Sequence, residues 1–154
     1  MGFVDQSLMP GEQVTYRATL HWIIFGPPIL LGLLAVLLVA FGMSNRDAAV
    51  VAGLGGFLFG AACVLAVSRL ITLKTSEFAV TNKRVLIKVG FIRRHSLELL
   101  LTKVEGIGVD QGILGRILGY GTIVVAGTGG TKEPFENIAQ PLEFRKHVQA
   151  GVAA

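Results

Sequence analysis

The chain has 154 residues, of which 52% are hydrophobic and only 16% are charged. A soluble globular domain is usually about 25% charged, so part of this chain is expected to avoid water. The single cysteine, Cys63, excludes an internal disulfide and a zinc site built from cysteines. The formal net charge is +4, and 12 of the 14 lysines and arginines lie from Arg69 onward. The basic character therefore belongs to the second half of the chain.

Two long uncharged segments dominate the first half of the chain. The core of the first runs from Trp22 to Met43, and the second runs from Ala48 to Ser68. A bilayer core of about 30 Å requires roughly 20 helical residues, so each segment is long enough to span it. The polar, acidic start and the length of the first segment argue against a cleaved signal peptide. Because the linker is short, the two spans are expected to form an antiparallel helical hairpin.

These segments predict three parts of the chain. The first is an N-terminal cytoplasmic segment, 1–19. The second is a transmembrane hairpin, 20–69, with spans at about 21–43 and 48–68. The third is a β domain, 70–154.

The distribution of positive charge predicts the orientation of the hairpin. Lysines and arginines favour the cytoplasmic side of a membrane. The linker offers only Arg46 beside Asp47, whereas four cations follow the second span: Arg69, Lys74, Lys83 and Arg84. Both termini of this multi-pass chain are therefore predicted to be cytoplasmic. His21 and Trp22 lie where an interfacial anchor is expected.

Small and rigid residues mark both spans. Gly26-Pro27-Pro28 is expected to kink the first span or delay its start, or to form a re-entrant segment. In the second span, Ala52, Gly56 and Gly60 recur every four residues, a spacing that lets helices approach closely. This helix-packing face is either a dimer seam or the contact with the first span, and we favour the second interpretation.

After Arg69 the apolar residues begin to alternate with polar ones, which is typical of β-strands. A short helical turn is predicted at 111–118, and a C-terminal helix from Pro141 with an apolar stripe of Phe144, Val148 and Val152. The alternation predicts seven strands, at 70–75, 77–81, 84–90, 92–101, 104–110, 121–127 and 132–138. Such a chain can bury a core by curling the sheet and plugging it with the helix.

Three stretches resemble one family: Pro10-Gly11-Glu12-Gln13-Val14, Phe78-Ala79-Val80-Thr81-Asn82-Lys83-Arg84-Val85 and Gly115-Arg116-Ile117-Leu118-Gly119-Tyr120-Gly121-Thr122. The chain is similar over nearly its whole length to the bacterial pleckstrin-homology-like family, also called the membrane-flanked domain. The resemblance implies a membrane α-helical hairpin that carries a mainly-β, PH-like split barrel with a C-terminal helix. It implies a location in the bacterial inner membrane and transfers no catalytic residues.

No catalytic, cofactor or metal site is predicted. The three histidines, His21, His95 and His147, lie far apart and have no carboxylate or cysteine at metal-ligand spacing. Gly127 to Lys132 lacks the spacing of a phosphate loop and is interpreted as a hairpin turn. No helix-turn-helix or aromatic-basic RNA motif accompanies the basic residues, so nucleic acid is not expected as a partner.

The basic residues of the domain have two interpretations, which the sequence leaves open. Each could gain about 1 kcal/mol near an anionic leaflet, or they could simply be solvated charges that set the topology. The candidate anionic-lipid contacts are Lys83, Arg84, Lys88, Arg93, Arg94 and Arg116.

We therefore expect a non-enzymatic integral membrane protein whose PH-like domain is a membrane-proximal binding and oligomerisation module, a scaffold. A split barrel has exposed strand edges that can pair with another strand. The expected partners are membrane lipids, a second copy of the chain, and other membrane proteins or peptides. The alternative function is an anionic-lipid sensor that uses the basic surface.

Overall fold

The computed structural model describes residues 3–44, 48–90, 95–128, 130 and 132–153. These residues form two units. One unit is Trp22–Ile71, and the other combines Met1–His21 with Thr72–Ala154. Residues 3–19, which are predicted as a separate N-terminal segment, lie in the same unit as the β domain.

The unit Trp22–Ile71 is helical throughout its described length. A 3-10 turn, η1 (Trp22–Phe25), leads into helix α2 (Gly26–Ser44), and helix α3 (Ala49–Thr75) follows the linker. Pro27 and Pro28 occupy the first turn of α2, where a missing backbone donor costs nothing. The prolines therefore delay the helix instead of kinking it. Both helices are long and apolar enough to cross a membrane.

The strand predicted at 70–75 is wrong, because α3 continues to Thr75. The segment from Leu70 to Thr75 contains no glycine or proline that would end a helix. Six residues are also too few to separate a helical period from a strand period.

Small residues bring α2 and α3 together. A Cβ atom placed on Gly42 would lie 2.5 Å from the backbone nitrogen of Ala52. One placed on Gly55 would lie 2.8 Å from a Val39 methyl group and 2.9 Å from the carbonyl oxygen of Ala35. Because no side chain intervenes, the two backbones approach closely along this line.

The three residues of the predicted helix-packing face do not all face α2. Ala52 does contact α2, but a Cβ atom on Gly56 or Gly60 would meet nothing within 4 Å, and both glycines are exposed. Packing against α2 therefore turns Gly55 inward and Gly56 outward. The rest of the helical surface is apolar, and six side chains are at least two thirds exposed: Leu30, Leu37, Met43, Val50, Phe57 and Val64. Such a surface is suited to hydrocarbon and not to water.

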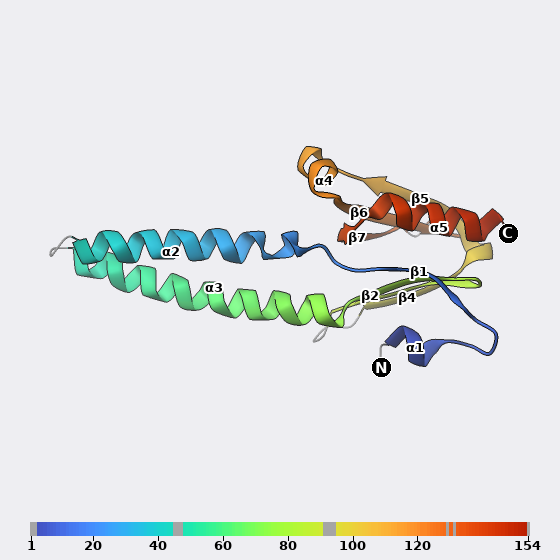
Figure 1. Ribbon diagram of the computed structural model, residues 1–154, viewed down its shortest axis with the longest axis horizontal. Helices are drawn as coiled ribbons and strands as arrows, with labels where there is room; N and C mark the ends of the chain where they lie inside the picture. The colour runs from blue at the N-terminus through green and yellow to red at the C-terminus, as the bar shows by residue number, and fades with distance from the viewer. Residues whose placement is uncertain (1–2, 45–47, 91–94, 129, 131, 154) are drawn as a thin grey trace. The chain divides into compact units, whose positions relative to one another are not determined.

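Seven strands form two antiparallel sheets in the other unit (Figure 1). The order is β1-β2-β3-β4 in one sheet and β5-β6-β7 in the other. The strands are β1 (Val14–Ala18), β2 (Glu77–Thr81), β3 (Arg84–Val89), β4 (His95–Leu100), β5 (Val104–Asp110), β6 (Tyr120–Gly127) and β7 (Lys132–Ala139). The first strand comes from the N-terminal segment, where Val14, Tyr16 and Ala18 alternate with polar residues.

In the part of the chain that the structure describes, backbone hydrogen bonds between strand segments join the two sheets at one corner. Beyond β1, Leu20 forms a bridge with Ile138 of β7. The amide of His21 donates to the carbonyl oxygen of Asn137 over 2.7 Å, and the amide of Ala139 donates to that of Thr19 over 2.9 Å. Among the described strands, β4 and β5 are therefore the free edges, and the expected PH-like split barrel is confirmed.

Four short helical elements complete this unit: α1 (Phe3–Ser7), η3 (Leu101–Lys103), α4 (Ile113–Leu118) and α5 (Pro141–Ala153). The C-terminal helix α5 contacts β1, β2, β5, β6 and η3. Its residues Phe144 and Val148 are fully buried in the core, whereas Val152 is 48% exposed. The predicted plug is thus confirmed for its first two turns, and the last turn of α5 stays at the surface.

Candidate functional site

The first family-like stretch folds as a tight turn. Gly11 has a φ of +76°, and the amide of Glu12 donates to the carbonyl oxygen of Met9 over 2.9 Å. Proline second and a positive-φ glycine third are the features of a type II turn. The turn directs the Glu12 side chain into the domain, where it is completely buried.

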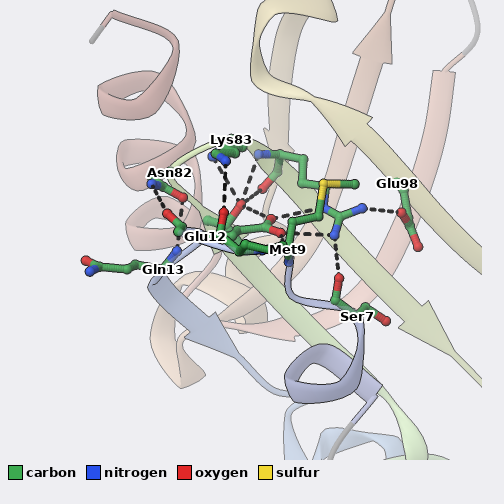
Figure 2. Close-up of polar contacts among 11 residues, drawn as sticks. Ser7, Met9, Glu12, Gln13, Asn82, Lys83 and Glu98 are labelled. Atoms are coloured by element: carbon green, nitrogen blue, oxygen red, sulfur yellow. Dashed lines mark hydrogen bonds and ion pairs between the residues drawn. The ribbon is translucent and has the colours of Figure 1, made fainter.

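Glu12 is held by two strands distant in sequence, as Figure 2 shows. The guanidinium of Arg84 donates to both carboxylate oxygens, over 2.9 and 3.0 Å. The hydroxyl of Thr81 donates over 2.7 Å, and the amide of Met9 over 2.8 Å. The hydrogen bond from Arg84 is the largest cause that lowers the pKa of Glu12 from 4.5 to about 2, although burial opposes the shift.

Arg84 has further partners on both sides of Glu12. It donates to Glu98 over 2.7 Å and to the carbonyl oxygen of Ser7. Beside it, the amide of Gln13 donates to the Asn82 side chain over 3.0 Å. The hydrogen bond to Glu12 is the main cause that raises the pKa of Arg84. Hydrogen bonds and an ion pair therefore join the first two family-like stretches.

The candidate lipid contacts that the structure describes do not form one surface. Arg84 is only 7% exposed, and its guanidinium donates to Glu12 and Glu98, so it is turned into the domain. Lys83 is exposed beside η3, where its carbonyl accepts the amide of Leu101. Lys88 lies five residues along β3, about 16 Å away, paired with the first residue of β2. Arg93 and Arg94 lie outside the described residues.

Lys88 and Arg116 have different surroundings. The ammonium of Lys88 lies 4.6 Å from the ring centroid of Phe3. Arg116 is exposed on α4, at the end of β5 opposite η3. Lys88 is near the point where the chain arrives from α3, because β2 begins at Glu77 and α3 ends at Thr75.

The glycines of the third family-like stretch have steric roles. A Cβ atom on Gly115 would lie 2.6 Å from the carbonyl oxygen of Tyr120, and one on Gly121 would lie 2.7 Å from that of Asp110. Gly119 ends α4 with a φ of +78°, and its amide donates to the carbonyl of Gly115. This stretch therefore fixes α4 against the start of β6.

Each of the two histidines whose side chains the structure describes stacks on a tyrosine. His21 stacks on Tyr120 with ring centroids 5.3 Å apart, and His147 stacks on Tyr16 at 4.3 Å. Within the part of the chain that the structure describes, no group of three or more histidine, cysteine, aspartate or glutamate residues could hold a metal ion.

A groove runs between the free edge of β5 and helix α5. It has a volume of about 200 Å³. Its β5 wall includes Val104 and Ile107, and its α5 wall includes Val148 and Val152. We call it the β5–α5 groove. The sequence predicts exposed strand edges but not this groove, because the docking of α5 beside β5 is a tertiary contact.

The fold thus defines a PH-like split barrel joined to a helical hairpin. The model of the Bacterial PH domain family matches residues 25–152, which include both helices of the hairpin and most of the barrel. The chain therefore belongs to the bacterial PH domain family. Comparisons with curated proteins and with solved structures found no significant match.

Proposed function

We propose that the protein is a non-enzymatic, membrane-anchored scaffold whose PH-like domain pairs with a second copy of itself through the β5–α5 groove. The observation that carries this proposal is the free edge of β5. Among the described strands, β5 pairs with β6 only, and the groove beside it can accept side chains, since its lining is mainly apolar and also includes Glu105 and Gln149. Strand addition to such an edge supplies main-chain hydrogen bonds, while a neighbouring groove supplies side-chain contacts.

A second copy suits this edge for a geometric reason. When β5 of one copy pairs antiparallel with β5 of a second copy about a two-fold axis, the free β5 edges of both copies are satisfied at once. The spans would hold both copies in one bilayer. Gly56 and Gly60 support the same proposal, because they face away from α2 and leave α3 open to another helix.

The positive charge after the second span supports an orientation with both termini in the cytoplasm, in the inner membrane of a bacterium. In that orientation the barrel lies on the cytoplasmic side of the membrane. Other membrane proteins or peptides could use the same strand edge as a second copy does.

The test is cross-linking of the full chain in native membranes. Val152→Asp introduces a charge into the groove at a half-exposed position. We expect the wild type to give cross-linked oligomers and Val152→Asp to lose them. Leu142→Asp is the matched control, since Leu142 is 51% exposed on the same helix but does not line the groove. Monomer alone from the wild type, or oligomers that survive Val152→Asp, would contradict the proposal.

The second candidate function, anionic-lipid binding, is favoured by the exposure of Arg116 and by the place of Lys88 beside the start of β2. We expect Lys88→Glu with Arg116→Glu to reduce the anionic lipid that co-purifies with the full chain in polymer-bounded membrane discs. Lys83→Glu is the control, because Lys83 lies at the other end of β3. An unchanged lipid composition in the double variant would remove this function.

A further inference from the structure

Helix α4 exposes almost all of its apolar side chains. Ile113 is 81% exposed, Ile117 74% and Leu114 64%, and Leu118 is 39% exposed. We call these four side chains the α4 patch. A contiguous apolar surface that a fold keeps uncovered usually marks an interaction site.

The exposure is a fixed feature of the fold. Gly115 lets α4 lie directly on the carbonyl of Tyr120, where a Cβ atom would be 2.6 Å away. The side-chain amide of Gln111 donates to that same carbonyl over 2.9 Å. Gly119 then ends the helix with a backbone conformation that favours glycine. These contacts hold the inner face of α4 on β6 and turn the α4 patch outward.

The position of the α4 patch indicates what covers it. Tyr120 stacks on His21, with ring centroids 5.3 Å apart. His21 is bonded to Trp22, the first residue of the first candidate span. Leu118 precedes Tyr120 by two residues, so their Cα atoms lie within about 8 Å. The patch is therefore close to the point where the chain passes from the barrel into its first apolar segment.

The charge of α4 suits the same surface. Arg116 is the only charged residue between Gln111 and Leu118, and it is exposed. A long basic side chain beside apolar ones can reach lipid phosphates while its neighbours contact acyl chains.

We propose that α4 inserts the α4 patch into the boundary between headgroups and acyl chains of the membrane and so gives the barrel a third attachment to the bilayer. The first two attachments are the covalent links to α2 and α3. The proposal rests on the membrane hairpin of the proposed function. It does not depend on pairing through β5.

The experiment uses site-directed spin labels on the full chain in lipid nanodiscs of mixed neutral and anionic lipids. Labels are placed at Ile113→Cys and Ile117→Cys in a Cys63→Ala background. Power saturation then compares collisions with oxygen, which concentrates in lipid, and with a water-soluble nickel chelate. We expect both labels to collide more with oxygen than with the chelate. Arg116→Glu should shift the balance at Ile117→Cys toward the chelate.

Two controls separate the possible failures. Thr102→Cys labels an exposed residue of η3, at the opposite end of β5, about 20 Å away, and should collide mainly with the chelate. A label on the native Cys63, which is exposed on α3, should collide mainly with oxygen.

If the label on Cys63 is shielded from the chelate but the label on Ile117→Cys matches that on Thr102→Cys, the α4 inference is wrong and the membrane hairpin is supported. If Cys63 also meets the chelate, both are wrong. Spin–spin broadening at Ile117→Cys that vanishes on dilution with unlabelled chain would show that a second copy covers the patch, which also overturns the inference.

Discussion

Replacement of Glu12 by glutamine should weaken the barrel more than any comparable change of a surface carboxylate. The carboxylate of Glu12 is fully buried and accepts hydrogen bonds from Arg84, Thr81 and Met9. The amide of the Glu12→Gln variant can retain some of these hydrogen bonds. The substitution removes the negative charge that compensates the guanidinium of Arg84, and residue Arg84 is itself only 7% exposed.

The magnitude follows from the pKa of Glu12. A lowering from 4.5 to about 2 corresponds to about 3 kcal/mol of stabilisation of the charged form, at 1.36 kcal/mol per unit. Removal of one partner from a buried ion pair costs about 3–5 kcal/mol. Glu98 still contacts Arg84 in the variant, so the lower end applies. We expect Glu12→Gln to lower the free energy of unfolding of the barrel by about 3 kcal/mol, or roughly a hundredfold in the opening equilibrium.

The same shift predicts a pH dependence. Because the pKa of Glu12 is lower in the folded barrel than in the unfolded chain, its contribution is complete above about pH 4.5 and is lost as the pH falls toward 2. The wild-type barrel should therefore lose about 3 kcal/mol across this interval through Glu12. Glu12→Gln should lack this loss and show a flatter profile.

The assay is hydrogen exchange by mass spectrometry on the full chain in nanodiscs. Peptides that cover β2 and β3 are followed, and each rate is divided by its intrinsic rate at that pH. Glu143→Gln is the control, since the Glu143–Lys146 pair is exposed with a separation of 3.8 Å, and exposed pairs contribute about 0–1 kcal/mol. A loss of protection below about threefold in Glu12→Gln, or a pH profile equal to that of the wild type, would refute the reasoning.

Three further substitutions test other contacts. Gly55→Ala should weaken the packing of α3 on α2, because its Cβ atom would lie 2.8 Å from Val39. Gly56→Ala should leave this packing unchanged, since its Cβ atom would meet nothing within 4 Å, and mobility shifts on detergent gels compare the two variants. Glu77→Ala should release the N-terminal residues to protease, since Glu77 accepts the amides of Phe3 and Val4 over 2.8 and 2.9 Å and each such charged hydrogen bond contributes about 1.5–3 kcal/mol. Gly115→Ala should raise hydrogen exchange in α4, and equal exchange in the wild type and this variant would contradict the close contact with β6.

Several features follow from local sequence alone. The apolar segments determine two long helices, because an uninterrupted run of such residues has no polar face to present to water. Alternation predicts the six strands that follow the hairpin, and Pro141 with Phe144 and Val148 predicts the helix that plugs the core. The sequence also contains the family-like stretches, although it does not show which of their residues pair with one another.

Tertiary structure decided which of these residues are buried and paired. Charge alone placed Arg84 on a basic surface, yet the turn at Gly11 delivers a buried carboxylate to it from 72 residues away. Spacing alone selected Gly56, yet the crossing of α2 and α3 uses Gly55. The first strand lies before the hairpin, and its alternation over only five residues was too short to be recognised without its partner β2. The β5–α5 groove and the outward face of α4 depend in the same way on contacts between segments distant along the chain, which no local pattern encodes.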